Sequence, residues 1–163
     1  MNRILLVLLM VGVSVWIGCG RSRKVTGPDG SETTVTTKGD NVEVTFKGAK
    51  GETVQVAGGK GNVPLPEGFP DDVPVYPGAK VMTSAKTKEG MTLVLTTSDP
   101  LQKAMEFYQG KLKTNGWDIQ NTMNMPDGGM LSGTKEKRTC TLVVNHSNDQ
   151  TIITISVSEK ETQ

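Results

Sequence analysis

The C-terminal half of the chain alternates apolar and polar residues with a period of two, and this pattern is interrupted once. Such alternation is typical of half-buried β-strands. Ile153, Ile155 and Val157, for example, share one strand face. Strands are predicted over residues 79–87, 91–97, 117–125, 130–135, 138–146 and 151–158.

The interruption has the period of an amphipathic helix. Its apolar stripe consists of Leu101, Met105, Tyr108 and Leu112. Asp99 and Gln102 stand at capping-box spacing around Pro100, so we expect Asp99 to cap the first turn. Asn115-Gly116 is expected to end the helix.

These elements predict an α+β domain with the order β-β-α-β-β-β-β. One helix cannot cover both faces of a parallel sheet. We therefore expect a mostly antiparallel sheet with the single helix packed on one face.

A glycine-rich region comes before this domain. Residues 20–62 contain nine glycines and few large apolar side chains. Short alternating segments at residues 32–37, 41–46 and 52–56 predict a small β-meander. Its apolar residues are too few to offset the entropy of ordering a separate domain, so the meander either docks on the C-terminal domain or frays.

A proline-rich strap joins the two regions. Five of the eight prolines lie between residues 64 and 77, which excludes a helix or a central strand there. Phe69, Val75 and Tyr76 are expected to pack on the domain, and Tyr76-Pro77-Gly78-Ala79 fits a type II turn.

The N-terminus has the pattern of a signal peptide. Arg3 is followed by an apolar run of 14 residues, 4–17, and then by Gly18 and Cys19. As a helix this run rises roughly 21 Å, short of a hydrocarbon core of about 30 Å. The segment resembles the signal peptide of bacterial lipoproteins, although Trp16 stands where the pattern usually has Leu.

The resemblance implies cleavage before Cys19 and acylation of its thiol with diacylglycerol, palmitate being an expected acyl chain. An uncleaved short anchor and plain secretion are the alternatives. By the same resemblance, Gly20 favours the outer membrane over the inner one. The expected division is a signal peptide at 1–18, a meander and spacer at 19–62, a strap at 63–77 and the α+β domain at 78–160.

A second resemblance rests on the strap. Residues 65–70 and 75–79, with Phe107-Tyr108 and Gly116-Trp117, resemble uncharacterised bacterial lipoproteins that have a Tyr-Pro-Gly-Ala strap. The group implies an envelope location and one α+β domain, and it carries no activity to transfer.

Charge and cysteine content narrow the function classes. The formal net charge is +1, which argues against nucleic acid as a partner. The segment 135–138 is expected to be a solvated hairpin end. If Cys19 is acylated, Cys140 has no intrachain partner, and its strand pattern predicts a buried small apolar residue.

Candidate catalytic groups are sparse. His146 is the only histidine and lies beside a polar turn, so we expect it to be exposed. A hydrolase would require distant polar residues such as Asp118, Arg138 and His146 to converge. Asp71-Asp72 is expected to be solvated, one histidine with one thiol falls short of a zinc site, and no cofactor is predicted.

Three methionines suggest a second kind of site. Met123, Met125 and Met130 surround one turn, and soft thioethers favour Cu(I). The competing interpretation is that these side chains fill gaps in the core.

The sequence thus predicts a non-enzymatic envelope lipoprotein, attached to the membrane through Cys19, that binds a partner such as an envelope protein or maintains the envelope. The alternatives are a soft-metal-binding lipoprotein and, with less support, a hydrolase.

Overall fold

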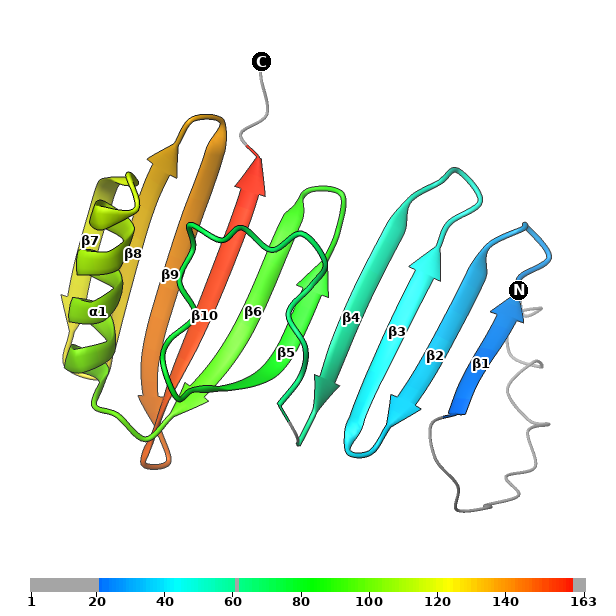
Figure 1. Ribbon diagram of the computed structural model, residues 1–163, viewed down its shortest axis with the longest axis horizontal. Helices are drawn as coiled ribbons and strands as arrows, with labels where there is room; N and C mark the ends of the chain where they lie inside the picture. Colours follow the sequence, from blue (N-terminus) through cyan, green and yellow to red (C-terminus); the bar gives the residue numbers. More distant parts are fainter. Residues whose placement is uncertain (1–20, 61, 160–163) are drawn as a thin grey trace, which may run out of the picture.

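The computed structural model describes residues 21–60 and 62–159, so Trp16, Cys19 and Gly20 lie outside the described residues. The described chain forms ten strands and one helix (Figure 1). In chain order these are β1 (Arg21–Thr26), β2 (Glu32–Lys38), β3 (Asn41–Lys47), β4 (Thr53–Gly59), β5 (Lys80–Lys86), β6 (Gly90–Thr97), α1 (Leu101–Thr114), β7 (Asp118–Met125), β8 (Gly128–Lys135), β9 (Arg138–Ser147) and β10 (Gln150–Glu159).

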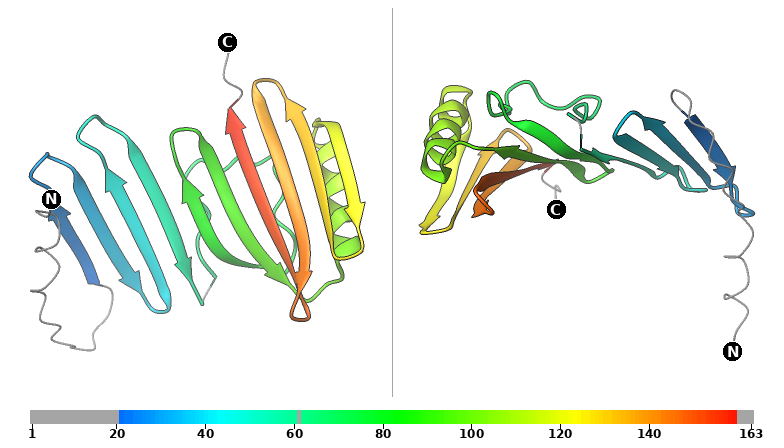
Figure 2. Two further views of the ribbon diagram at one scale, coloured as in Figure 1. Left: turned by 180° about the vertical axis from the view of Figure 1, so that it is seen from behind. Right: turned by 90° about the horizontal axis from the view of Figure 1, so that it is seen from below.

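The strands form one open sheet in the order β1-β2-β3-β4-β5-β6-β10-β9-β8-β7, and every neighbouring pair is antiparallel. Helix α1 connects the central strand β6 to the edge strand β7 and packs over β7, β8 and β9 (Figures 1 and 2). The predicted α+β class, with one helix on one face of an antiparallel sheet, is confirmed for the described residues.

The meander is part of this same sheet, which the sequence did not predict. β4 pairs with β5 from Gln55↔Lys86 to Gly58↔Thr83, so the strands join edge to edge. The meander also has a strand more than the sequence predicted. β1 was missed because its only apolar residue is Val25, and alternation therefore gives no signal there.

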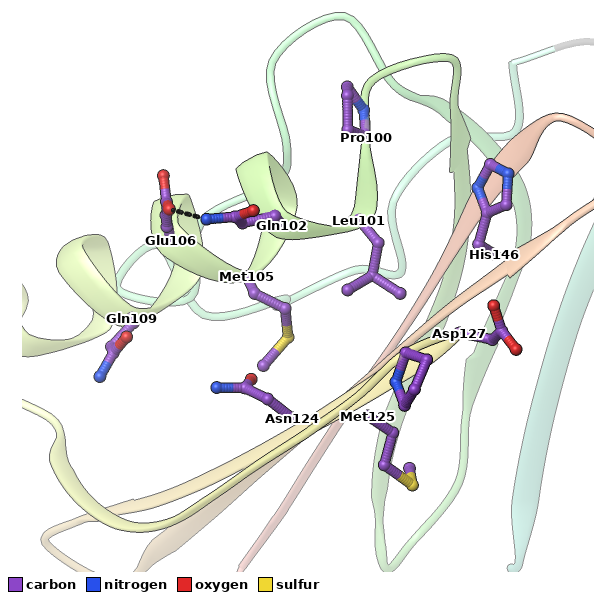
Figure 3. A pocket seen from close by; sticks show the side chains of 11 residues that line it. Pro100, Leu101, Gln102, Met105, Glu106, Gln109, Asn124, Met125, Asp127 and His146 are labelled. Carbon is purple, nitrogen blue, oxygen red and sulfur yellow. Dashed lines mark hydrogen bonds between the residues drawn. The ribbon is translucent and has the colours of Figure 1, made fainter.

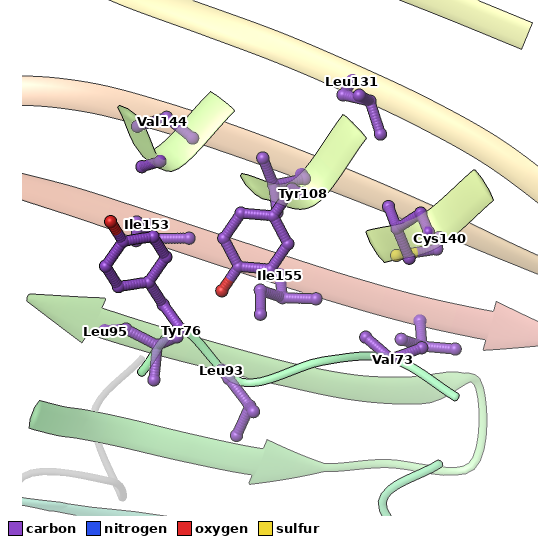
Figure 4. Packing of buried hydrophobic residues seen from close by; sticks show 14 of the residues in the cluster. Val73, Tyr76, Leu93, Leu95, Tyr108, Leu131, Cys140, Val144, Ile153 and Ile155 are labelled. Atoms are coloured by element: carbon purple, nitrogen blue, oxygen red, sulfur yellow. The ribbon is translucent and has the colours of Figure 1, made fainter. Parts of the chain in front are cut away.

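The buried core lies between the sheet and two covering segments, α1 and the strap, which both lie on one face (Figure 2). The predicted helix stripe is largely confirmed, because Met105, Tyr108 and Leu112 are buried and Leu101 is partly buried. From the sheet, the fully buried side chains include Leu142 and, as Figure 4 shows, Leu93, Leu95, Leu131, Val144, Ile153 and Ile155.

Cys140 confirms its predicted place in this core. Its side chain has no exposed surface, and burial raises the pKa of the thiol to about 12. A thiol that stays protonated and covered is a packing group.

The start of α1 differs from the prediction. Pro100 occupies the N-cap position and no side chain caps the first turn. The Asp99 carboxylate instead accepts a hydrogen bond from Tyr76 Oη at 2.8 Å and pairs with Lys103 Nζ at 3.0 Å. Gln102, the other half of the expected capping box, donates to Glu106. A partner from the distant strap has replaced the local cap.

The turn at the end of the strap is confirmed. The Ala79 amide donates to the Tyr76 carbonyl at 3.2 Å, and Gly78 has φ +75°, which favours glycine. This turn places the Tyr76 ring against α1, where its centroid lies 5.0 Å from that of Phe107.

Across residues 21–60 and 62–159, no helix combines the length and apolar character needed to cross a membrane.

Candidate ligand-binding cleft

A cleft of about 660 Å³ opens between the N-terminal half of α1 and the facing ends of β7 and β9 (Figure 3). From the α1 side its lining residues are Pro100, Leu101, Gln102, Met105, Glu106 and Gln109. From the sheet side they are Asn124, Met125, Pro126, Asp127 and His146.

The bottom of the cleft is apolar. Met105 points from α1 towards the sheet and is almost fully buried, and Leu101 lies beside it (Figure 3). Gly129 on β8 makes this approach possible, because a Cβ there would lie 2.8 Å from Met105 Sδ. The missing side chain at Gly129 thus leaves space on the sheet, and the flexible Met105 side chain occupies this space and forms the floor of the cleft.

The rim of the cleft is polar. Gln102, Glu106 and Gln109 recur along one side of α1, and Gln102 Nε2 donates to Glu106 Oε1 at 2.9 Å. Asn124 faces them from β7 (Figure 3). These amides and carboxylates lie next to the apolar stripe, so the helix presents two kinds of surface to one opening.

The ionisable groups of the lining are Glu106, Asp127 and His146, and the lining contains no lysine or arginine. Carboxylates without a facing cation favour a ligand that is neutral or cationic and donates hydrogen bonds, and disfavour an anion. The arrangement suits a small molecule with an apolar body and a donor group.

Hydrogen bonds fix the corner of the cleft where three chain segments meet. The His146 amide donates to the Asp127 carbonyl at 3.0 Å, which ties β9 to the β7–β8 turn. Thr151 Oγ1 donates to the Asp99 carbonyl at 2.6 Å, which ties β10 to the start of α1. The cleft is therefore largely pre-formed by the fold.

The residues considered for a hydrolase do not converge. His146 is exposed, as predicted, and lies at the cleft, whereas Arg138 begins the same strand at its other end. Eight residues of extended strand separate them by roughly 27 Å. Asp118 starts β7 opposite Thr134, at the Arg138 end. In the part of the chain that the structure describes, no three His, Cys, Asp or Glu side chains gather as a metal site.

Asp72 is the centre of a polar cluster, so its predicted solvation is wrong. Arg138 Nη1 and Nη2 donate to the Asp72 carboxylate at 2.9 and 2.7 Å, and Lys135 Nζ donates at 2.7 Å. The Asp72 carbonyl accepts from Trp117 Nε1 and Asn115 Nδ2. The hairpin end at 135–138 is likewise not simply solvated.

These contacts have an electrostatic consequence. The hydrogen bonds from Arg138, followed by those from Lys135, hold the pKa of Asp72 at about 2, below its ordinary value of 3.8. We refer to Asp72, Asn115, Trp117, Lys135 and Arg138 as the strap clamp, because they fasten the strap to the end of α1 and to the β8–β9 hairpin. This is a structural role.

The three methionines are not core residues. Met123 and Met125 are each 51% exposed, which contradicts the core interpretation for both. Met123 pairs with Met130 across β7 and β8 on the face opposite α1. Met125 follows on the same side at the end of β7, where it also borders the cleft.

The sequence did not single out the rim residues Gln102, Glu106, Gln109 and Asn124 as a site. A signal was present, because the three polar helix positions recur at helical spacing beside the apolar stripe. It could not be recognised as a rim without knowing that the β7–β8 turn lies opposite.

Comparison with known proteins gives one finding. A search of curated proteins and a search of solved structures each returned no match. Residues 79–159 match the family model described as START domain-like, and this segment contains α1, strands β5 to β10 and every residue that lines the cleft. The C-terminal part of the chain is therefore similar to START domain-like proteins.

Proposed function

We propose that the chain is a membrane-anchored lipoprotein of the bacterial envelope whose α+β domain binds a small amphipathic ligand in the cleft beside α1. The cleft carries this proposal, because an apolar floor, a polar rim and the absence of lining cations occur together in one pre-formed opening. The START domain-like match over the same elements supports a binding role.

The anchor part of the proposal rests on the signal-peptide pattern and on Cys19. One acyl chain binds a bilayer only marginally, whereas more than one holds firmly. We expect Cys19→Ala to release the chain from membranes or to leave its signal uncleaved. Membrane fractionation shows whether the variant is released, and mass spectrometry shows whether its signal peptide has been cleaved. Unchanged processing and unchanged membrane retention would refute the anchor. Gly20 leads us to propose the outer membrane, which fractionation of the two membranes tests.

A non-enzymatic role is part of the proposal. The separation of His146 from Asp118 and Arg138 supports it. An envelope protein as a further partner is tested by pull-down of the lipidated chain from membranes.

Ligand binding is tested with two water-soluble aromatic probes of similar size, benzylammonium, which donates hydrogen bonds, and phenylacetate. We expect the full chain to bind the cation more tightly than the anion by calorimetry, because Glu106 and Asp127 line the cleft. Gln109→Trp fills the cleft and should weaken cation binding about tenfold or more, roughly 1.4 kcal/mol.

The matched control is Lys113→Trp, an exposed position on the same helix outside the cleft. It should bind like the parent chain. If Gln109→Trp also binds like the parent, or if the anion binds as well as the cation, the cleft is not the site we propose.

A second candidate function is soft-metal binding by Met123, Met125 and Met130. The observation that favours it is the sharing of one exposed face by three thioethers, two of them on paired positions. A Cu(I) titration against a competing chelator tests it, with Met123→Leu expected to abolish binding. No affinity tighter than micromolar would end this candidate.

A further inference from the structure

Strands β1 to β4 carry an apolar surface on the side of the sheet opposite α1. Val56 on β4 pairs with Ala85 on β5, and Ala85 pairs with Thr92 on β6. Thr92 precedes the core residue Leu93, so its side chain points to the opposite face of the sheet. Val56 therefore also lies on the face away from the core. We call this surface the apolar meander face. Its residues are Val25, Val35, Val42, Val44, Phe46, Val54 and Val56.

Four of these seven side chains are open to solvent, whereas Val35, Val44 and Val54 are partly buried. Val25 is 64% exposed, and Val42, Phe46 and Val56 are each 40% exposed or slightly more. The other face of the same strands is polar and carries the ion pair between Lys24 and Glu32. A contiguous exposed apolar patch of this kind marks an interaction surface.

Within strands β1 to β4 the charges on this face have one sign, and the nearest carboxylate on the same side is Glu52, just before β4. Arg23 pairs with Val35, and Arg21 with Thr37, so both guanidinium groups extend from the same side as the apolar side chains. The carboxylates within β1 to β4 are Glu32 and Glu43, and both alternate to the opposite side. Two cations beside an apolar patch complement anionic lipid headgroups above acyl chains.

The size of the patch argues against a second copy of the chain. Four strands at about 4.8 Å spacing and seven residues at about 3.4 Å cover roughly 450 Å². A stable dimer needs about 800 Å² from each partner. Beyond β5 the same side is mixed, because Val94, Val143 and Met130 alternate there with hydroxyl residues such as Thr92 and Ser156, whose Oγ atoms lie 3.3 Å apart. The continuous apolar area therefore ends at β5.

We infer that the apolar meander face, with Arg21 and Arg23 at its edge, lies on a bilayer that contains anionic lipid. Val25 and Phe46 enter the boundary between headgroups and acyl chains, and the guanidinium groups bind headgroup phosphates. Helix α1 and its cleft occupy the opposite face of the sheet and stay accessible from the aqueous side. The inference rests on the described strands alone and requires neither acylation at Cys19 nor ligand in the cleft.

The test uses two neighbouring positions that point to opposite sides of β3, Phe46→Trp and Thr45→Trp. Each full chain is reconstituted in vesicles of phosphatidylglycerol and brominated phosphatidylcholine, and quenching is measured as the difference from the parent chain, since the native tryptophans are common to all. We expect added quenching for Phe46→Trp and none for Thr45→Trp. Circular dichroism establishes that both variants are folded.

Charge reversal supplies the second arm. Arg21→Glu with Arg23→Glu in the Phe46→Trp chain should reduce the added quenching at least twofold, and vesicles without phosphatidylglycerol should do the same. Equal added quenching in the Phe46→Trp and Thr45→Trp chains, or none in the Phe46→Trp chain, overturns the inference. Fluorescence of the Phe46→Trp chain that shifts with protein concentration in the absence of lipid points to a second copy and also overturns it. The mass of the chain reports acylation separately, so failure of the anchor is distinguishable.

Discussion

Two tyrosines of the core differ in what their hydroxyl groups contact. Tyr76 from the strap and Tyr108 from α1 lie with ring centroids 6.1 Å apart (Figure 4). Tyr76 Oη donates to Asp99, whereas Tyr108 Oη is buried and forms no well-aligned hydrogen bond with the described residues, the Tyr76 backbone being the polar group beside it. Burial raises the pKa of both phenols, that of Tyr76 to about 12 with a contribution from Asp99.

This difference predicts opposite effects of one substitution. Tyr108→Phe removes an unsatisfied buried hydroxyl and should leave the free energy of unfolding unchanged or raise it by about 1 kcal/mol. Tyr76→Phe removes a made hydrogen bond and should lower it by about 1 kcal/mol. Urea denaturation monitored by circular dichroism measures both. Equal destabilisation by the two variants would show that Tyr108 Oη is satisfied in solution.

Two glycines make a second contrast at the same scale. Gly110 lies on the exposed side of α1, and a Cβ there would meet nothing within 4 Å. Gly110→Ala should therefore stabilise the chain by about 0.5–1 kcal/mol through helix propensity. A Cβ at Gly129 would press on the flexible side chain of Met105, so Gly129→Ala should destabilise the chain by up to about 1 kcal/mol. Thermal unfolding ranks the variants, and a stable Gly129→Ala chain would mean that Met105 moves into the cleft.

At the scale of elements, the strap depends on its clamp. The pKa of Asp72 in the folded chain is depressed to about 2. Its contribution to the free energy of unfolding is therefore fully present above pH 4 and is lost as the pH falls towards 2. A shift of almost two pKa units corresponds to about 2.4 kcal/mol as an upper limit. The Asp72 side chain is 22% exposed, so we expect about 1–2 kcal/mol.

The prediction is that Asp72→Asn lowers the free energy of unfolding by this amount at pH 7, and that the difference from the parent chain shrinks towards pH 2. Urea titrations across this pH range measure it. Asp71→Asn, at the exposed neighbouring position, should have almost no effect at any pH. A difference that persists unchanged at pH 2 would place the loss in packing and not in charge.

The elements themselves were readable from periodicity, whereas their tertiary partners were not. The stripe Met105, Tyr108 and Leu112 follows from helical spacing alone. The cap was mispredicted because Tyr76, 23 residues away, binds Asp99, and the solvation of Asp72 was mispredicted because Arg138 is 66 residues away. The cleft was predictable only in part. Its helix side follows from helical spacing, whereas its sheet side depends on where the β7–β8 turn lies.

At the scale of the whole molecule, one sheet contains two parts of unequal burial. β1, β2 and β3 contribute no side chain to the buried core, which begins with Ala57 on β4. The junction is short, because β4 pairs with β5 at four positions and with β3 at seven. The low burial of these strands agrees with the prediction that the meander has too few apolar residues to fold alone. The meander instead joins the C-terminal domain by extending the edge of its sheet.

A large sheet with so little core at one end should open there first. We predict that the amides of β1 to β3 exchange at least about tenfold faster than those of β6, β9 and β10, through an opening at least about 1.4 kcal/mol below global unfolding. Hydrogen exchange with mass spectrometry on the lipid-free chain measures this. Ala57→Asp, buried at the junction against Ser84, should increase exchange in β1 to β4 and leave β9 and β10 protected. Lys47→Asp at an exposed position is the control. Uniform protection across all ten strands would show one cooperative unit, and then the apolar meander face would be held rigidly in place by the core that it adjoins.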